Sequence, residues 1–339
     1  MILLIGNISS KFGLNPTAIE DLFLELQKKY KVKIASSKSF RSSRLIDMLS
    51  LIYLNRKKCR IIILDVFSTK AFYFSAGVIL LAKYLRLNCI PVFRGGNLSN
   101  RYEKNKRLFN YLYRDSIIIC PSSFIGDYFQ EEGFKIQVVP NYIDLSNYNF
   151  KLRENFRPKL LWVRSLHKIY NPTMAIDVLA EIIKKYPDAE LCMVGPSKDD
   201  SLYKIKRKVE KLNLQNNIII TGGLSKDRWI ELSEKYDIFI NTTNFDNQPV
   251  TLIEAMALGM PVVSTNAGGI IKLIIHKENG LLVDKEDAIN MVSYINRLIE
   301  DSNLGLDISK NARLHVEKLH SKEKVMKEWF RIIKEQYGS

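Results

Sequence analysis

Residues 242–263, TTNFDNQPVTLIEAMALGMPVV, place a carboxylate one turn after the start of a predicted helix. Pro249 is typical of the first turn of a helix, so the chain is predicted to become helical there. The backbone N–H groups of Val250 and Thr251 have no partners inside such a helix, and a phosphate binds well at this positive end of the helix dipole. Glu254 lies one turn further on the same face, where its carboxylate can accept hydrogen bonds from two neighbouring ribose hydroxyls.

The other interpretation of Glu254 is a solvated carboxylate on a helix surface. Its neighbours argue against this interpretation, because residues 252–258 are otherwise apolar on all sides of the predicted helix. A carboxylate on such a helix is expected to be buried, and a buried carboxylate needs partners.

Arg164 is a second candidate, since it follows the apolar run 160–163. An arginine at the carboxyl end of a buried strand can bind an anion, and the alternative is an ion pair with a helix carboxylate. Lys168 comes four residues later and can reach a phosphate as a mobile point charge.

The loop of residues 6–16 is a third candidate for phosphate binding. Gly13 lets the backbone approach a phosphate ahead of a helix, although a plain strand-to-helix turn fits the loop equally well. The spacing G-x-G-x-x-G is absent from this loop, which disfavours a nicotinamide enzyme.

Short apolar runs alternate with longer amphipathic stretches along the whole chain, which predicts an α/β fold with parallel sheets. Helical spacing is clearest in 17–30 and 72–87. In doubly wound sheets the loops at the carboxyl ends of strands bind ligands. The predicted strands are 2–5, 32–35, 61–64, 89–93, 116–120, 136–139, 160–163, 190–194, 217–221, 237–241, 261–264 and 280–283.

The alternation of strands and helices occurs twice, so we predict two doubly wound, Rossmann-like domains at 1–150 and 151–320. The turn-rich segment 140–158 separates them, and a cleft between two such domains is a common place for a ligand. Residues 302–337 read as two amphipathic helices. These helices either cover a sheet face or, through the helix in 321–339, pack back on the first domain.

The composition is that of a globular protein: 339 residues, 46% hydrophobic and 26% charged. Its unusual property is a net charge of +15, which favours a polyanion, a phosphate or an anionic membrane as partner. Residues 1–150 hold 22 Lys and Arg against 11 Asp and Glu, an excess of 11, whereas residues 151–339 hold 29 against 25. Solvated helix faces are the alternative explanation of the basic clusters.

No apolar run is long enough to span a bilayer, and the four cysteines show no paired spacing, so we expect a reducing cytoplasm. The four histidines form no metal spacing, and Asp-x-Asp does not occur. We therefore expect no metal and no other cofactor.

Asp246, the seven residues after it and the run EAMALGMPVV resemble the E-x7-E segment of retaining GT-B glycosyltransferases of family four. Four further segments resemble that family, and the similarity is continuous over roughly residues 116–300. They are VPNYID at 139–144, MVGPS at 193–197, IIITGGLSKDRWIELSEKYDIFI at 218–240 and STNAGGI at 264–270.

The resemblance implies a role for each matched residue on the side of the sugar donor. Glu254 binds the donor ribose, and Asp246, one methylene shorter than the family's glutamate, contacts the hydroxyls of the donor sugar. Arg164 and, one position out of register, Lys168 neutralise the diphosphate. The implied donor-binding positions are Gly13, Gly195, Gly222, Val250, Thr251 and Glu254.

On the acceptor side, the family's positions correspond to Asp65 and to the run Arg94, Gly95, Gly96 and Asn97. Arg94 stands where the family has a histidine, and it can hold an acceptor phosphate. The glycine pair permits close backbone approach.

The resemblance implies transfer of a hexose-type sugar from a nucleoside diphosphate sugar to a hydroxyl of a glycan or lipid-linked acceptor, with retention at the anomeric carbon. It implies a place in the biosynthesis of cell-surface polysaccharide or glycolipid. Two alternatives remain: an inverting enzyme with Asp65 as general base, or a sugar-nucleotide-binding protein without catalysis.

The excess charge of the first domain predicts docking on the anionic inner face of the cell membrane. A nucleic-acid partner is disfavoured, because the phosphate-binding features lie in the less basic half of the chain.

Overall fold

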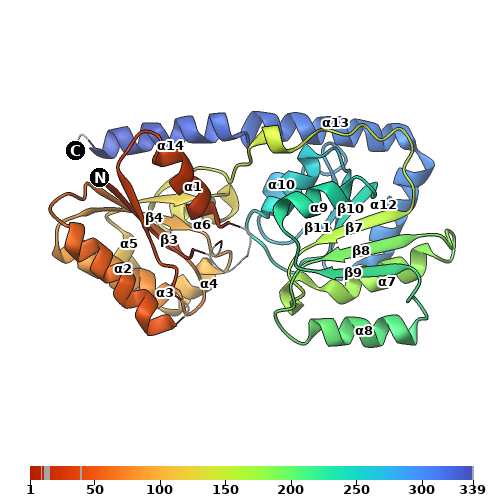
Figure 1. The fold of residues 1–339 in the computed structure, drawn as a ribbon, viewed down its shortest axis with the longest axis horizontal. Coiled ribbons are helices and arrows are strands. Elements are labelled where there is room, and N and C mark those ends of the chain that lie inside the picture. The colour runs from red at the N-terminus through yellow and green to blue at the C-terminus, as the bar shows by residue number, and fades with distance from the viewer. Residues whose placement is uncertain (9, 11–15, 39, 338–339) are drawn as a thin grey trace. The chain divides into compact units, whose positions relative to one another are not determined.

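The computed structural model describes residues 1–8, 10, 16–38 and 40–337. The chain forms two compact units. Unit 1 comprises Met1–Asn141 and Glu323–Ser339, and unit 2 comprises Tyr142–Lys322 (Figure 1). Unit 1 therefore contains two separate stretches of the chain, whereas unit 2 is contiguous.

Unit 1 is built on a six-stranded sheet with the order β2-β1-β3-β4-β5-β6, in which every strand pair is parallel. Its strands are β1 (Ile2–Ile5), β2 (Val32–Ala35), β3 (Ile61–Val66), β4 (Asn88–Phe93), β5 (Ile117–Cys120) and β6 (Lys135–Val138). Its helices are α1 (Ala18–Leu26), α2 (Arg41–Asn55), α3 (Phe72–Tyr84), α4 (Leu98–Lys104), α5 (Lys106–Tyr113), α6 (Ser123–Glu131) and α14 (Lys322–Tyr337).

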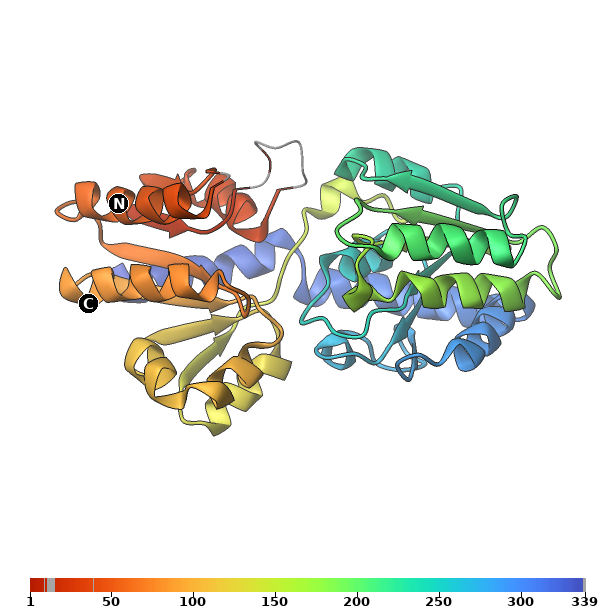
Figure 2. The same cartoon turned by 90° about the horizontal axis from the view of Figure 1, so that it is seen from below.

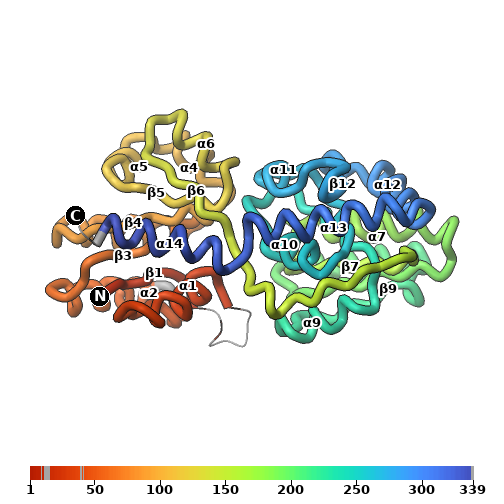
Figure 3. The backbone as a smooth tube through the Cα atoms, turned by 90° about the horizontal axis from the view of Figure 1, so that it is seen from above, coloured from red at the N-terminus to blue at the C-terminus, as the bar shows by residue number. Residues whose placement is uncertain are grey.

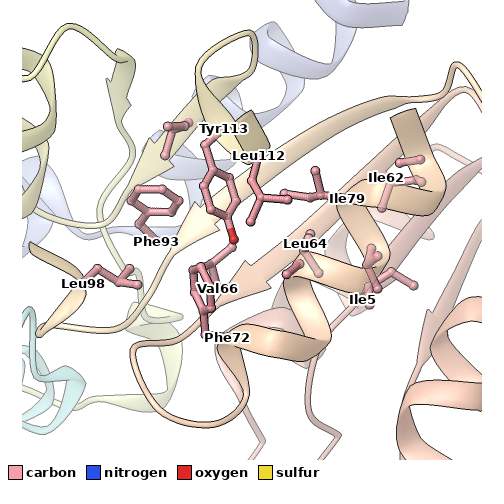
Figure 4. Packing of buried hydrophobic residues seen from close by; sticks show 14 of the residues in the cluster. Ile5, Ile62, Leu64, Val66, Phe72, Ile79, Phe93, Leu98, Leu112 and Tyr113 are labelled. Carbon is pink, nitrogen blue, oxygen red and sulfur yellow. The ribbon is translucent and has the colours of Figure 1, made fainter. Parts of the chain in front are cut away.

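The core of unit 1 lies between one face of the sheet and the helices α2 to α6. Aromatic rings dominate the part next to α3 and α5 (Figure 4). Phe93 meets Tyr113 edge-on with ring centroids 5.3 Å apart, and Phe72 stacks on Phe109 at 5.6 Å. Such ring pairs stabilise the packing beyond the area they bury, so the elements around the ends of β3 and β4 are firmly held.

Unit 2 has a six-stranded parallel sheet with the order β12-β11-β10-β7-β8-β9. Its strands are β7 (Lys159–Val163), β8 (Glu190–Val194), β9 (Ile218–Gly222), β10 (Ile238–Asn241), β11 (Val262–Thr265) and β12 (Leu281–Val283). Its helices are α7 (Pro172–Ile182), α8 (Ser201–Lys211), α9 (Lys226–Ser233), α10 (Val250–Ala257), α11 (Ile270–Leu273), α12 (Ala288–Glu300) and α13 (Ser302–Leu319).

Successive residues of β7 supply the two faces of this sheet. Leu160 and Trp162 pack with α7, α8 and α12, while Leu161 and Val163 pack with α9, α10 and α13. The α7 and α8 helices lie side by side on their face of the sheet (Figure 2). Both faces are covered, which explains why the strands read as continuous apolar runs.

The α14 helix belongs to unit 1 although it follows unit 2 in the chain. It lies along α1 and β6 (Figure 3). The Phe330 ring is 4.0 Å from Nζ of Lys29, and Gln137 on β6 donates a hydrogen bond to Glu328. Trp329 on the same helix is buried.

The predicted fold class is confirmed: both units are doubly wound α/β layers with parallel sheets. Each predicted strand is present, with ends that differ by at most two residues. The chain passes from unit 1 to unit 2 between Asn141 and Tyr142 rather than at residue 150. No helix among the described residues is long and apolar enough to cross a membrane.

Candidate functional site

Unit 2 has its topological switch point between β7 and β10, because the chain continues from β7 to β8 on one side and returns to β10 on the other. Ligands of doubly wound sheets bind outside the carboxyl ends of the strands at such a point. Arg164 directly follows β7, and Asp246 lies in the loop after β10. The two predicted residues are therefore brought together by the topology.

The Arg164 guanidinium forms an ion pair with the Asp246 carboxylate and lies 4.7 Å from the centre of the Tyr170 ring. Burial lowers the pKa of Arg164 from its usual value, and interactions with Tyr170 and Glu254 partly offset that shift. An arginine stays charged after such a shift. Among the described residues, Nε of Arg164 has no hydrogen-bond partner, so the group keeps a donor for a ligand.

Hydrogen bonds hold the loops after β7 and β10 against each other. The Asn244 N–H donates to the Ile169 carbonyl at 2.8 Å, and the Thr242 hydroxyl lies 3.0 Å from the Tyr170 carbonyl oxygen. The indole N–H of Trp162 donates to the Thr242 hydroxyl at 3.0 Å. The backbone around Arg164 and Asp246 is thus fixed by the core of unit 2.

The loop that carries Asp246 also packs tightly on the loop after β11. The Gly269 N–H donates to the Asp246 carbonyl at 2.9 Å. Gly268 has a φ of +63°, and a Cβ atom there would collide with the same carbonyl. A glycine is required at this position both for its backbone conformation and for space.

Glu254 lies on α10 and is buried, as the apolar neighbours predict. The Tyr148 hydroxyl donates to Oε1 of Glu254 at 2.6 Å, and Nζ of Lys226 is 3.2 Å from the same oxygen. These contacts fix the carboxylate one turn inside the helix. Pro249 precedes the first helical residue rather than occupying the first turn, so the helix begins at Val250.

The N–H groups of Val250 and Thr251 lie in the first turn of α10 and have no partners within the helix. They and Glu254 share one helix, and this helix packs in the same core cluster as Val163, the last residue of β7. The Glu254 charge accordingly acts on Arg164. The site thus combines a cation, helix N–H donors and two carboxylates. Such a set can hold a diphosphate together with a polyhydroxylated group.

The remaining predicted donor-side residues lie in loops of the same sheet edge. Lys168 is exposed, and its N–H donates to the Asp199 carboxylate at 2.9 Å. A Cβ atom on Gly195 would collide with the Arg164 carbonyl, so this glycine permits close packing of β7 and β8. Gly222 ends β9 with a φ of +73° and open space around it. Gly13 lies outside the described residues.

The predicted acceptor-side residues cluster at the carboxyl ends of β3 and β4 in unit 1. Arg94 is already engaged: its Nε donates to Asp65 at 3.0 Å and its Nη1 donates to Asn141 at 2.8 Å. Burial raises the pKa of Asp65 above its usual value, and the Arg94 charge opposes the shift. The structure thus gives Arg94 a structural role that the sequence did not predict.

The glycines next to Arg94 differ in their surroundings. A Cβ atom on Gly95 would collide with the backbone of Ser68, so Gly95 permits close packing of the loops after β3 and β4. Gly96 is partly exposed, and Asn97 is exposed just before α4.

Sequence reasoning missed Lys226 and Tyr148, the two partners of Glu254. Tyr148 lies in the segment predicted to be a linker, and Lys226 is the first residue of α9. No spacing in the sequence connects these residues with Glu254. Only the charge of a buried carboxylate signals that partners exist somewhere in the chain.

Within the part of the chain that the structure describes, no three His, Cys, Asp or Glu side chains gather in a way that could hold a metal ion.

Comparison with known proteins agrees with the geometry. Residues 147–315 match the family model "Glycosyl transferases group 1". An uncharacterized glycosyltransferase of Haemophilus influenzae is 29% identical over 205 residues, which cover 59% of this chain and 56% of that protein. The N-acetyl-alpha-D-glucosaminyl L-malate synthase of Bacillus anthracis is 25% identical over 57% of this chain and 52% of its own length. The chain thus spans about half the length of these curated relatives.

Solved structures match nearly the whole chain. HepE of Anabaena in complex with UDP has a TM-score of 0.76 at 17% identity, and the match covers 98% of this chain and 99% of HepE. Sucrose-phosphate synthase of Thermosynechococcus elongatus has a TM-score of 0.79 at 15% identity, over 99% of both chains. These matches identify the fold as GT-B, as predicted. Through residues 147–315, the protein belongs to the glycosyl transferases of group 1.

Proposed function

We propose that the protein transfers a hexose-type sugar from a nucleoside diphosphate sugar to a hydroxyl of a glycan or lipid-linked acceptor, with retention at the anomeric carbon. The observation that carries the proposal is the meeting of Arg164 and Asp246, near Glu254, at the switch point of unit 2. HepE, whose structures hold UDP or UDP-glucose, supports the donor class.

In this mechanism the main barrier is departure of the diphosphate from the anomeric carbon. Arg164 and the N–H groups of Val250 and Thr251 stabilise the negative charge that develops on the leaving phosphate. Glu254, held by Tyr148 and Lys226, accepts hydrogen bonds from the ribose hydroxyls, and Asp246 accepts them from the sugar.

The acceptor oxygen forms its bond to the anomeric carbon on the face that the diphosphate leaves. The acceptor proton passes to an oxygen of the departing phosphate, so no protein nucleophile is needed. Lys168, exposed on the neighbouring loop, adds a mobile positive charge. The reaction as proposed uses no metal ion.

An inverting mechanism needs a general base in unit 1, and Asp65 was the candidate. Asp65 is buried and its carboxylate already accepts a hydrogen bond from Arg94, so an incoming hydroxyl has little access to it as a general base. The ion pair between Asp65 and Arg94 therefore favours the mechanism that retains the anomeric configuration. The anomeric configuration of the product, read by NMR, decides between the two mechanisms, and an inverted product would contradict our proposal.

We also propose that the protein works at an anionic membrane surface on the cytoplasmic side, in the biosynthesis of polysaccharide or glycolipid. The excess charge of residues 1–150 supports this location. Among the relatives are an amylovoran biosynthesis glycosyltransferase of Erwinia amylovora and a poly(ribitol-phosphate) alpha-N-acetylglucosaminyltransferase of Staphylococcus aureus.

A panel of nucleoside diphosphate sugars tests the donor class. A ligand that binds only the folded protein raises its melting temperature, so we expect one nucleotide family to stabilise the wild type. Arg164→Ala should lose most of this stabilisation, read as the melting-temperature difference between the variant with and without ligand, and about 100–1,000-fold in turnover.

Lys184→Ala is the matched control, since it removes an exposed cation of unit 2 whose partner is Glu181. Near-wild-type turnover of Arg164→Ala would contradict the proposed role of Arg164. Donor binding without transfer to any acceptor would indicate a binding protein without catalysis.

A further inference from the structure

Unit 1 contains a cavity of about 400 Å³ beside the loops that follow β3 and β4. This volume lies within the usual range for small-molecule sites. Its wall comes from Ser68 and the start of α3, from Asn97 and the α4 helix, and from the start of α5. Among the lining residues are Tyr73, Asn97, Asn100, Arg101 and Lys104.

The lining suits a saccharide. Tyr73 lines the cavity and is 61% exposed although it lies on a helix of the core, so part of its ring offers apolar surface to a ligand. Asn97 and Asn100 are exposed, and their amides can both donate and accept hydrogen bonds. An open aromatic face combined with planar polar side chains matches the apolar and hydroxylated sides of a pyranose ring.

The lining also suits an anion. Arg101 and Lys104 both line the cavity, and none of the lining residues is Asp or Glu. Lys104 is exposed. The nearby acids have other partners, since Glu103 pairs with Lys106 at 3.2 Å and Glu132 accepts a hydrogen bond from Tyr102. The cavity therefore carries positive charge that its own wall does not neutralise.

Arg101 is fixed in place before any ligand arrives. Its Nε donates to the Ser68 carbonyl at 2.7 Å, and its guanidinium lies 4.7 Å from the Phe72 ring centre and 5.4 Å from the Tyr73 ring centre. A cation held in this way loses little conformational entropy when it binds an anion. Arg94, by contrast, is engaged by Asp65 and Asn141.

We propose that this cavity binds the acceptor, and that the acceptor carries an acidic group, a carboxylate or a phosphate, on the saccharide unit next to Tyr73. The pyranose ring stacks on Tyr73. The acidic group binds to Arg101 and Lys104, and the hydroxyls bind to Asn97 and Asn100. The identification of the ligand as the acceptor rests on the proposed transferase function; the site itself does not.

Residue-resolved NMR of the full chain tests the site, with glucuronate, glucose 1-phosphate, glucose and inorganic phosphate as probes. We expect both acidic sugars to shift amide resonances of residues 72–73 and 97–108. Glucose and inorganic phosphate should each bind at least about 5-fold more weakly, because each provides only half of the contacts.

Tyr73→Ala and Lys104→Gln should each weaken binding of the acidic sugars by about 5–10-fold. Matched controls are Tyr84→Ala, on the same helix but outside the cavity and 83% exposed, and Lys57→Gln, at an exposed position of unit 1. Both controls should bind like the wild type. A difference between the two acidic sugars identifies whether carboxylate or phosphate is preferred.

The proposal is overturned if the shifts are absent, if they lie elsewhere in unit 1, or if inorganic phosphate binds as tightly as glucose 1-phosphate. Binding of glucose 1-phosphate at the donor site would shift resonances of unit 2 and is thus distinguished. If the acidic sugars shift the cavity resonances but no nucleoside diphosphate sugar binds, the transferase function is rejected and the cavity site stands. If a nucleoside diphosphate sugar binds but the acidic sugars do not shift the cavity resonances, only this inference is rejected.

Discussion

The ion pair between Arg164 and Asp246 should limit how tightly a donor binds. In the absence of a donor, the carboxylate of Asp246 partly cancels the charge of the group that is proposed to bind the diphosphate. The diphosphate of a donor must therefore compete with Asp246 for Arg164. The sugar hydroxyls of the donor then donate hydrogen bonds to Asp246 in place of Arg164.

Asp246→Asn separates these two effects, because it removes the negative charge and keeps the shape of the side chain. We expect the nucleoside diphosphate alone to bind about 2–10-fold more tightly, since Arg164 is then free of its partner. Turnover should fall, since the sugar loses an acceptor of its hydrogen bonds. Calorimetric titration and initial rates measure the two quantities.

Asp188→Asn is the control, because it removes the same charge from an exposed position of unit 2. If Asp246→Asn weakened binding of the nucleoside diphosphate, the competition between Asp246 and the diphosphate would be refuted.

At the level of residues, the sequence predicted positions better than contacts. The positions of Arg164 after a buried strand and of Glu254 on a mostly apolar helix follow from local spacing, and the structure places both there. Lys226 and Tyr148 were not, because their contact with Glu254 depends on tertiary packing. For the same reason the sequence left Arg94 free, whereas the fold places it against Asp65.

Among the elements, α10 shows how the fold supports the candidate site at a distance. Arg153 is buried and donates to the carbonyls of Leu258 at 3.1 Å and Gly259 at 3.0 Å, and Arg313 donates to the Ala257 carbonyl at 2.8 Å. Two cations thus satisfy the negative end of the helix whose positive end faces the proposed phosphate. The sequence did not indicate these partners, because they come from segments far from α10 in the chain.

The loops after β7 and β8 are joined by Asp199, and this link should depend on pH. Burial raises the pKa of Asp199, but hydrogen bonds from Ser201 and from the N–H of Lys168 lower it more, to about 2. A carboxylate whose pKa is lowered in the folded state stabilises the fold at pH values above its unfolded-state pKa, near 3.8. This stabilisation is lost as the pH falls toward the folded-state pKa of about 2.

Asp199→Asn should therefore lower the melting temperature at pH 7 by about 2–4 °C. The difference from the wild type should shrink as the pH falls below about 4. Asp200→Asn is the control, because Asp200 is exposed and pairs with Lys204 across one helix turn. A difference that grew below about pH 4 would contradict the assignment.

For the whole molecule, the uneven charge predicts where an anionic surface binds. We expect the chain to bind vesicles that contain phosphatidylglycerol at low salt and to leave them at about 0.5 M salt, because salt screens exposed charges. Vesicles of phosphatidylcholine should not bind. Co-sedimentation measures all three conditions.

Two charge-matched variants assign the vesicle binding to one unit. Lys57→Glu with Lys58→Glu should weaken it by about 10-fold or more, at about 1 kcal/mol for each basic residue near the surface. Lys206→Glu with Lys211→Glu makes the same change at exposed positions on α8 of unit 2 and should leave binding unchanged. Equal losses in both variants would show that only the total charge matters.

The position of α14 also sets an order in time for protein synthesis. Unit 2 is contiguous from Tyr142 to Lys322, so all of its parts have been translated before α14 leaves the ribosome. Unit 1 begins first but receives α14, with the buried Trp329, only after unit 2 has been made. During that interval the nascent first unit exposes the apolar surface that α14 later covers, which is the stage at which a chain is most exposed to aggregation and to chaperones.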